Sequence, residues 1–155
     1  GQPVVSKCGH SFIKDRMREA NAVYGGEMSA HHYFRDFFYC DSGMLPWLLV
    51  LEQISGSGQS LADIVRHYQA EFPCSGEINF TIANAPAVLE RLQQHYAADA
   101  LHRDRLDGLT MEFADWRFNL RSSNTEPVVR LNLETRGDTA LLAARTAELT
   151  ALITA

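Results

Sequence analysis

A short polar segment between two stretches of alternating apolar residues combines one arginine with several small hydrogen-bonding side chains. It reads RSSNTEP from Arg121 to Pro127. An arginine can meet phosphate oxygens with two parallel charge-assisted hydrogen bonds, while hydroxyl, amide and backbone N–H groups supply further donors. Backbone donors that converge in a turn form an anion-binding concavity without a helix. The segment therefore favours phosphate binding, although the same residues also suit an ordinary turn, in which they bond their own backbone.

A second polar segment lies upstream and reads GEMSAH from Gly26 to His31. Glu27, Ser29 and His31 alternate in it, so an extended backbone would present all three side chains on one side. One carboxylate, one hydroxyl and one imidazole together suit the vicinal hydroxyls of a sugar. This segment therefore favours binding of a sugar ring.

Together the two segments resemble the alpha-D-phosphohexomutase family, and most closely its bacterial phosphomannomutases. In that family a Gly-Glu-Met-Ser-Gly/Ala-His loop on the third domain reads sugar hydroxyls in both binding orientations. An Arg-Ser/Ala-Ser-Asn-Thr-x-Pro loop on the fourth domain holds the phosphate that is not being transferred. The resemblance extends over the whole chain. It implies that the sugar is bound by Glu27, Ser29 and His31. It implies that the phosphate is bound by Arg121, Ser123, Asn124 and Thr125.

A third candidate is His10, just ahead of a predicted helix. There an imidazole and free backbone amides can meet an anion, and the alternative is a histidine that caps the helix or is partly buried. The resemblance places a substrate-facing histidine at this position. Two neighbouring residues depart from the family pattern, because Cys8 stands where threonine is expected and Ala30 where glycine is commoner.

The resemblance implies an isomerase that interconverts mannose 6-phosphate and mannose 1-phosphate for nucleotide-sugar synthesis. In the family, a phosphorylated serine on the first domain exchanges phosphate with the sugar, and an Asp-Gly-Asp-Gly-Asp-Arg loop on the second holds magnesium. Neither motif occurs in this sequence. We therefore expect catalytic residues and magnesium ligands to lie outside this chain, on N-terminal domains of the same protein, and the chain alone to be inactive.

Two alternatives stay open. One is phosphoglucomutase or dual-specificity activity, because the Glu-Met-Ser loop is shared by these branches of the family. The other is a phosphosugar-binding or protein-interaction module without catalysis. A metal site at His31, His32 and Cys40 is disfavoured, since their spacing matches no compact zinc pattern.

The resemblance implies mannose and glucose phosphates as partners, and composition argues against other classes of partner. A formal net charge of -5 without a lysine- or arginine-rich block argues against binding to nucleic acid. The longest apolar run, Met44 to Leu51, is too short to span a bilayer, so we expect no membrane association. The three cysteines are widely spaced and odd in number, which fits thiols in the cytoplasm better than disulfides. The chain starts at Gly1 in a strand-like run, so we expect it to be part of a longer protein.

The first half of the sequence predicts helices joined by loops. Apolar residues recur at helical spacing over 11–19, 42–55 and 60–72, and a glycine pair at 25–26 opens a loop. Pro73 to Gly76 breaks the pattern and is the candidate linker. With this break as the boundary, the resemblance implies that residues 1–73 are the C-terminal part of the family's α/β third domain, which carries the predicted sugar-binding loop.

The second half changes to strand periodicity. Residues 77–82, 109–113, 116–121 and 129–134 alternate, Asp107-Gly108 predicts a hairpin, and helices are expected over 85–97 and 138–153. This order indicates an α+β domain over 77–155, with an antiparallel sheet of about four strands and helices packed on one face. The phosphate-binding loop lies in this domain.

Overall fold

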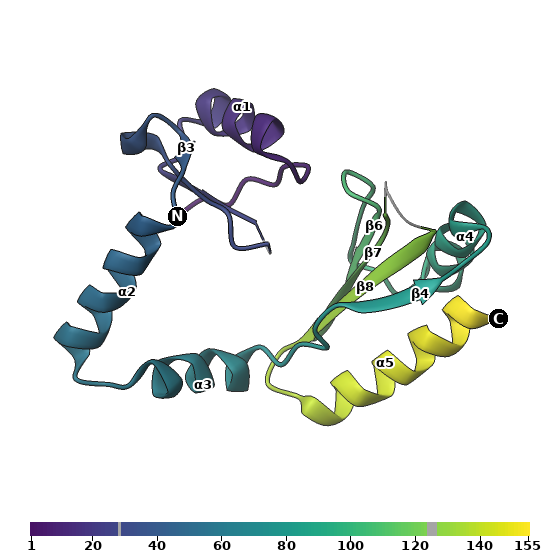
Figure 1. Ribbon diagram of the computed structural model, residues 1–155. Coiled ribbons are helices and arrows are strands. Elements are labelled where there is room, and N and C mark those ends of the chain that lie inside the picture. The colour runs from purple at the N-terminus through teal and green to yellow at the C-terminus, as the bar shows by residue number, and fades with distance from the viewer. Residues whose placement is uncertain (28, 124–126) are drawn as a thin grey trace. The chain divides into compact units, whose positions relative to one another are not determined.

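The computed structural model describes residues 1–27, 29–123 and 127–155 (Figure 1). Its contacts divide the chain into two compact units, Gly1–Asp63 and Ile64–Ala155. None of the helices in the described residues is long and apolar enough to cross a membrane.

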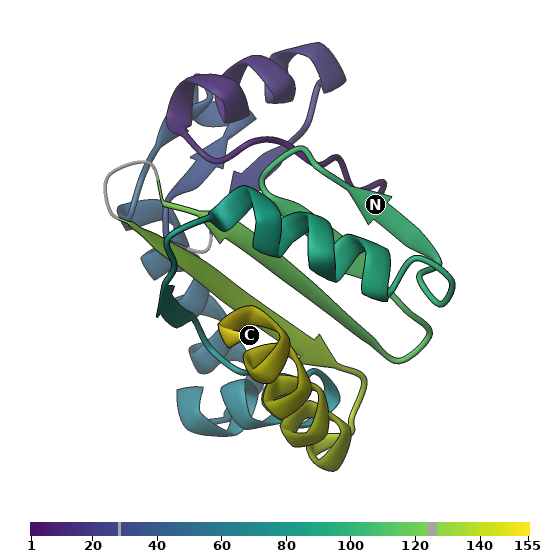
Figure 2. The same cartoon turned by 90° about the vertical axis from the view of Figure 1, so that its right-hand side faces the viewer.

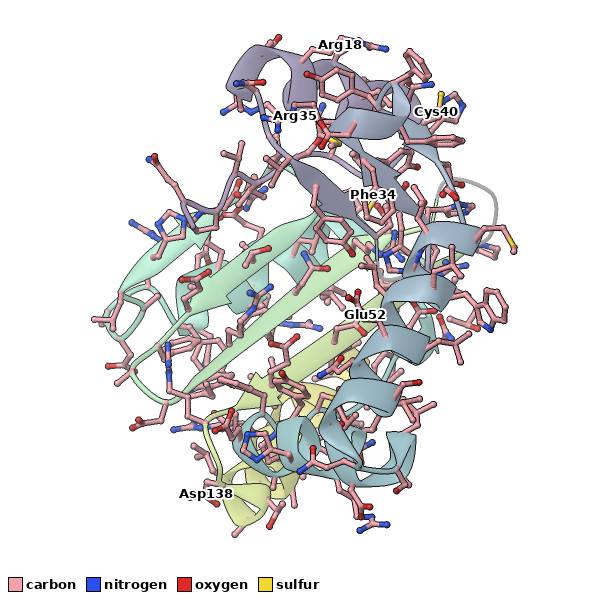
Figure 3. All side chains as sticks on the ribbon, turned by 90° about the vertical axis from the view of Figure 1, so that its left-hand side faces the viewer. Arg18, Phe34, Arg35, Cys40, Glu52 and Asp138 are labelled. Carbon is pink, nitrogen blue, oxygen red and sulfur yellow. The ribbon has the colours of Figure 1, made fainter. Side chains whose placement is uncertain are left out.

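The first unit is a helix packed on a small antiparallel sheet. Helix α1 (His10–Ala20) is followed by β1 (Tyr24–Gly26), β2 (His32–Phe34), a 3-10 turn (Arg35–Phe37), β3 (Cys40–Asp41) and helix α2 (Met44–Ser57), and the strands pair in the order β1-β2-β3. Figure 3 labels Phe34 of β2 and Cys40 of β3, which pair across these two strands. The prediction that Gly25 and Gly26 open a loop is wrong, because both residues belong to β1.

Gly25 is needed where β1 crosses α1. A Cβ atom at this position would lie 2.7 Å from Met17 Sδ and 3.2 Å from Ile13 Cγ2. Met17 and Ile13 lie one helical turn apart and, with Tyr33 of β2, form the buried core of this unit. The glycine therefore lets the hairpin approach the helix closely enough to bury Tyr33.

Helix α2 is apolar around most of its circumference. Ser42 Oγ accepts a hydrogen bond from the backbone N–H of Leu45 at its start, and Gly58 ends it in the left-handed conformation. All of its residues are described and none is buried, although a helix this apolar is normally covered on every side. The helix predicted over 42–55 is confirmed, but its wide apolar face stays exposed.

The second unit is a five-stranded antiparallel sheet with two helices on one face (Figure 2). Helix α3 (Leu61–Glu71), in which the boundary between the units falls, precedes β4 (Ile78–Thr81), α4 (Ala85–His95), β5 (His102–Asp104), β6 (Leu109–Glu112), β7 (Trp116–Ser122), β8 (Val128–Thr135) and α5 (Thr139–Thr154). The strand order is β4-β8-β7-β6-β5. The predicted architecture is confirmed, with one strand more than expected, because β5 has no apolar alternation to announce it.

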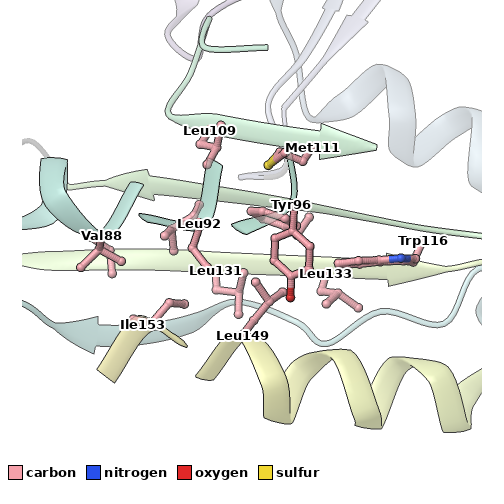
Figure 4. Packing of buried hydrophobic residues seen from close by; sticks show 13 residues of the cluster. Val88, Leu92, Tyr96, Leu109, Met111, Trp116, Leu131, Leu133, Leu149 and Ile153 are labelled. Carbon is pink, nitrogen blue, oxygen red and sulfur yellow. The ribbon is translucent and has the colours of Figure 1, made fainter. Parts of the chain in front are cut away.

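The core of the second unit lies between this sheet and helices α4 and α5 (Figure 4). Alternate residues of β7 and β8 point into it, including Phe118, Leu120, Leu131 and Leu133, which are almost completely buried. Both helices begin with a side-chain cap: Asn84 accepts a hydrogen bond from the N–H of Ala87, and Asp138 from that of Leu141. The opposite face of the sheet is polar (Figure 3).

The segment predicted as a linker runs beside β8. The N–H of Thr135 donates to the carbonyl of Pro73 at 2.9 Å, and the N–H of Ser75 to that of Leu133 at 2.9 Å. Ser75 Oγ in turn accepts from the N–H of Leu133 at 3.0 Å. Residues 73–75 are therefore anchored to the sheet of the second unit, and the domain division at 73–77 stays a prediction.

Candidate ligand-binding sites

A pocket of about 450 Å³ in the first unit collects the residues predicted to bind the sugar. The predicted residues in its lining are His10, Glu27, Ser29 and His31. The side chains that were not predicted are those of Lys14, Tyr33 and Asp41. These residues come from α1 and from the three-stranded sheet with its connecting turn. The structure thus brings the sugar-binding candidates and His10 to one cavity.

The segment predicted to bind the sugar lies between β1 and β2, which pair as a hairpin. The N–H of Glu27 donates to the carbonyl of His31 at 2.9 Å, and the N–H of Ala30 to that of Glu27 at 3.0 Å. Ala30 has φ 64°, in the left-handed region that glycine adopts without steric cost. The expectation of an extended loop is therefore wrong, because the chain folds back at Ala30. The three candidate side chains still line the same pocket.

Two hydrogen bonds fix the carboxylate of Glu27. Tyr33 Oη donates to Oε1 at 2.6 Å, and the backbone N–H of Gly9 donates to Oε2 at 3.2 Å. Burial of Tyr33, and then its bond to Glu27, raise the pKa of its hydroxyl, which therefore stays a donor across the ordinary pH range. Each carboxylate oxygen keeps a second acceptor site. Glu27 is thus held in one orientation and can still accept hydrogen bonds from a ligand.

Asp41 holds the imidazole of His31. The Nδ1 atom of His31 lies 2.6 Å from Oδ2 of Asp41, while Oδ1 accepts from the backbone N–H of His32 at 3.0 Å. This hydrogen bond is the main reason why the pKa of His31 is raised and that of Asp41 is lowered. With Nδ1 occupied, Nε2 is the ring nitrogen that remains for a ligand. Asp41 was missed from the sequence because no motif links it to a histidine ten residues earlier.

His10 and Lys14 belong to the first turns of α1. Gly9 precedes the helix with φ 119°, and its N–H donates to Glu27. One of the amides that were expected to meet an anion is therefore bonded to a carboxylate. Lys14 lies one turn after His10 and adds a cation to the pocket.

The predicted phosphate-binding arginine lies at the end of β7. Arg121 alternates with Leu120, which is buried, and so belongs to the polar face of the sheet. Its partner in the adjacent strand is Arg130 of β8. The N–H of Ser123 donates to the carbonyl of Val128 at 2.9 Å. The predicted ligands Asn124 and Thr125 lie outside the described residues.

A carboxylate on the same face contacts both arginines. Glu77 Oε2 lies 3.4 Å from Arg121 Nη2, and Glu77 Oε1 lies 3.7 Å from Arg130 Nε. Sequence reasoning did not mark Glu77, because residues so far apart meet only through the pairing of β4, β8 and β7. The second unit therefore presents two cations and one anion near its predicted phosphate loop.

A metal site does not arise in the part of the chain that the structure describes. Among residues 1–27, 29–123 and 127–155, no three His, Cys, Asp or Glu side chains are grouped so that they could hold an ion.

Comparisons with known proteins show the family to which the chain belongs. A family model described as phosphoglucomutase/phosphomannomutase, alpha/beta/alpha domain III, matches residues 1–72, and one described as phosphoglucomutase/phosphomannomutase, C-terminal domain, matches residues 77–152. The phosphomannomutases of Salmonella montevideo and Escherichia coli K12 are 63% and 60% identical to this chain over 153 residues, which are 99% of the chain and 34% of each relative. The chain therefore spans about a third of the length of these relatives.

A solved structure shows the same fold. The crystal structure of a phosphoglucomutase/phosphomannomutase family protein from Burkholderia thailandensis matches 99% of this chain and 32% of its own chain, with a TM-score of 0.75 and 27% identity. Two family models, curated relatives and a crystal structure thus confirm the resemblance found in the sequence. The chain belongs to the phosphoglucomutase/phosphomannomutase family.

Proposed function

We propose that this chain is the substrate-holding part of a phosphomannomutase, which interconverts mannose 6-phosphate and mannose 1-phosphate. The observation that carries the proposal is the convergence of Glu27, Ser29, His31 and His10 on one pocket in the first unit. The relatives named phosphomannomutase are 60–63% identical over almost the whole chain. We also propose that the protein works in the cytoplasm and serves nucleotide-sugar synthesis.

The pocket of the first unit has the chemistry to read sugar hydroxyls. Glu27 supplies fixed acceptor atoms, Ser29 a hydroxyl, and His31 the free Nε2 atom of an imidazole held by Asp41. A sugar hydroxyl is both a donor and an acceptor, so such a mixed set can bind neighbouring hydroxyls in either direction. This tolerance suits a mutase, whose sugar must bind both ways round.

The phosphate belongs to the second unit in this proposal. Arg121 is only 28% exposed at its side chain and is anchored on a strand, which favours a strong charge-assisted bond to a phosphate oxygen. Ser123, Asn124 and Thr125 share this role by resemblance to the family.

In this proposal, other domains of the same protein break and form the bonds to phosphate. The family supplies a phosphorylated serine and a magnesium ion, which neutralises charge during phosphoryl transfer, from domains that this sequence does not contain. The residues described here bind and orient the ligand. We therefore expect the chain of 155 residues to show no mutase turnover, and appreciable turnover would contradict this division of labour.

One alternative has support among the relatives. A Xanthomonas campestris protein that is 59% identical over 99% of the chain is named for phosphohexose mutases in general, which favours glucose phosphates as additional substrates. Comparing kcat/KM for mannose 1-phosphate and glucose 1-phosphate separates the two possibilities. A non-catalytic phosphosugar-binding module remains the alternative of another class.

A chimera tests the proposal. This chain replaces the matching third of the Escherichia coli K12 phosphomannomutase, and turnover of mannose 1-phosphate is measured. We expect an active chimera in which Arg121→Ala lowers kcat/KM by about 10- to 100-fold, since a hydrogen bond to a charged group contributes about 1.5 to 3 kcal/mol. Arg117→Ala removes a cation from the same face of the same strand and serves as the control. A folded but inactive chimera would refute the mutase assignment, and an unchanged kcat/KM in Arg121→Ala would remove Arg121 from the site.

A further inference from the structure

Two arginines face each other across neighbouring strands next to the predicted phosphate loop. Arg121 of β7 and Arg130 of β8 are register partners, and both belong to the polar face of the sheet. Like charges directly opposite each other in a sheet are unfavourable unless an anion lies close to both. Their side chains are only 28% and 29% exposed, so water screens the repulsion incompletely.

Glu77 supplies that anion in the absence of a ligand. Its two carboxylate oxygens divide between the arginines, with Oε2 at 3.4 Å from Arg121 and Oε1 at 3.7 Å from Arg130. Glu77 is 32% exposed at its side chain, so all three charged groups are similarly withdrawn from water.

The backbone on both sides of Glu77 is fixed to β8. Before it, the N–H of Ser75 bonds to the carbonyl of Leu133, and after it Ile78 pairs with Leu131. Between them, Gly76 has φ 68°, a conformation that glycine adopts readily. The carboxylate is therefore placed by the sheet itself, and it does not depend on a long loop.

We infer that Glu77 is an internal counter-ion of the phosphate clamp, which competes with the phosphate of the ligand for Arg121 and Arg130. This inference rests on the proposed function, because it assigns the ligand phosphate to Arg121. Glu77 is thus a residue that sets the affinity of the site and takes no part in bond breaking.

Charge arithmetic shows the effect of this competition. Two guanidinium groups could neutralise a phosphate dianion, but Glu77 cancels one of the two positive charges. A dianion entering the clamp must displace the carboxylate or bind beside it against repulsion. The consequence is a moderate affinity for phosphate. This suits a mutase, because the ligand must leave the clamp and bind again in the opposite orientation.

The experiment measures inorganic phosphate binding to the chain of 155 residues by amide NMR titration at fixed ionic strength. Glu77→Gln keeps the size of the side chain and removes its charge. Glu134→Gln is the matched control, because it makes the same charge change on β8, where the register partner is Arg117. Arg121→Ala tests the clamp itself. We expect Glu77→Gln to bind phosphate about two- to fivefold more tightly, the size of one partly exposed ion-pair interaction, and Glu134→Gln to bind like the wild type.

The outcomes separate this inference from the function on which it rests. If the wild type binds phosphate, Arg121→Ala does not, and Glu77→Gln binds no more tightly than Glu134→Gln, the counter-ion role is wrong while the clamp stands. Weaker binding by Glu77→Gln would mean that the carboxylate positions the arginines, which also overturns the inference. Equal binding by the wild type and Arg121→Ala, or no binding by any variant, would refute the clamp as well. Raising the salt concentration should shrink the gain in Glu77→Gln, because added ions screen the charge that it removes.

Discussion

The two units of this chain position their binding residues by different means. In the second unit, Arg121 is carried by a strand whose other face belongs to a cluster of thirteen buried residues, counted over the described part of the chain. In the first unit, the corresponding cluster of described residues comprises Ile13, Met17 and Tyr33. The segment proposed to bind the sugar joins strands of three residues each. The comparison teaches that packing fixes Arg121, the residue proposed to bind phosphate, whereas polar contacts fix Glu27 and His31, which are proposed to bind the sugar.

Those polar contacts hold two of the side chains proposed to bind the sugar, Glu27 and His31. Tyr33 and the N–H of Gly9 hold Glu27, while Asp41, itself bonded to the N–H of His32, holds His31. Such a network orients side chains well but transmits any lost hydrogen bond directly to the site. We therefore expect the second unit to be sensitive to changes of shape and the first to changes of single hydrogen bonds.

The largest effect should follow a change of shape behind Arg121. Gly108 has φ 80°, and a Cβ atom there would lie 2.4 Å from the carbonyl oxygen of Leu120 and 2.7 Å from the Cα atom of Arg121. Gly108→Ala should therefore lower the free energy of unfolding by about 2 to 5 kcal/mol, from the left-handed backbone and the overpacking together. It should also weaken phosphate binding, because β7 must shift at Arg121.

Gly76→Ala is the control for this prediction. Gly76 has φ 68°, but a Cβ atom there would meet no described atom within 4 Å. Gly76→Ala should therefore lower the free energy of unfolding by only about 1 to 2 kcal/mol, which is the cost of a left-handed backbone for alanine. Urea unfolding followed by the fluorescence of Trp116, in a Trp47→Phe background, measures both variants. Equal losses for the two alanines would show that close packing behind Arg121 does not matter.

An intermediate effect should follow the loss of one hydrogen bond in the first unit. Tyr33→Phe removes the donor to Glu27 Oε1 without changing the shape of the core, and should lower the free energy of unfolding of this unit by about 1 to 2 kcal/mol. Binding of mannose 1-phosphate should weaken at the same time, because Glu27 loses its orientation. Tyr39→Phe removes a hydroxyl from a residue packed on the same core and is the control. Unchanged ligand binding in Tyr33→Phe would contradict the view that polar contacts place the sugar residues.

The smallest effect on stability, and the most specific in its pH dependence, concerns the His31–Asp41 pair. Asp41 raises the pKa of His31 above its ordinary 6.5, and His31 lowers that of Asp41 below its ordinary 3.8. The histidine contribution to stability is complete below pH 6.5 and is lost as pH rises through its folded pKa. The carboxylate contribution is present above pH 3.8 and is lost as pH falls through its folded pKa. The wild type should therefore exceed Asp41→Asn in stability most clearly between about pH 4 and 6.5.

Proton NMR of the imidazole gives the direct test of this pair. The pKa of His31 should be lower in Asp41→Asn than in the wild type, while Asp36→Asn, which removes a carboxylate paired with Arg35, should leave it in place. A His31 pKa that does not respond to Asp41→Asn would show that the pair does not form in solution.

Sequence periodicity predicted the longer helices and strands, but it predicted burial correctly only where their apolar faces meet a core. In the helix predicted over 85–97, helical spacing puts Val88, Leu89, Leu92 and Tyr96 on one face; Val88, Leu92 and Tyr96 are buried, and Leu89 is partly buried against the same core. The same reasoning places Leu61, Ile64, Val65 and Tyr68 of α3 inward, yet Ile64 is only half-buried and the other three are exposed. Periodicity shows which residues share a face, but it does not show whether anything covers that face.

The short strands and the supporting charges were beyond the reach of the sequence. Strands β1 and β3 have too few residues to show a period, and Gly25 and Gly26 are typical of loops. Asp41 and Glu77 act through partners that strand pairing brings to them, and neither belongs to a motif. Motif resemblance therefore identified the residues proposed to touch the ligand, whereas only the structure identified the carboxylates that hold or oppose them.

The central claim is that each unit carries its own part of the ligand site, and one titration tests it most directly. Amide NMR spectra of the 155-residue chain are recorded with inorganic phosphate and with mannose 1-phosphate, for the wild type and Arg121→Ala. We predict that phosphate shifts the resonances around Arg121 and Arg130 only, that mannose 1-phosphate also shifts those of Gly25 to Tyr33, and that Arg121→Ala abolishes the first set. Phosphate shifts that center on the pocket of His10 and Lys14 and persist in Arg121→Ala would contradict the account.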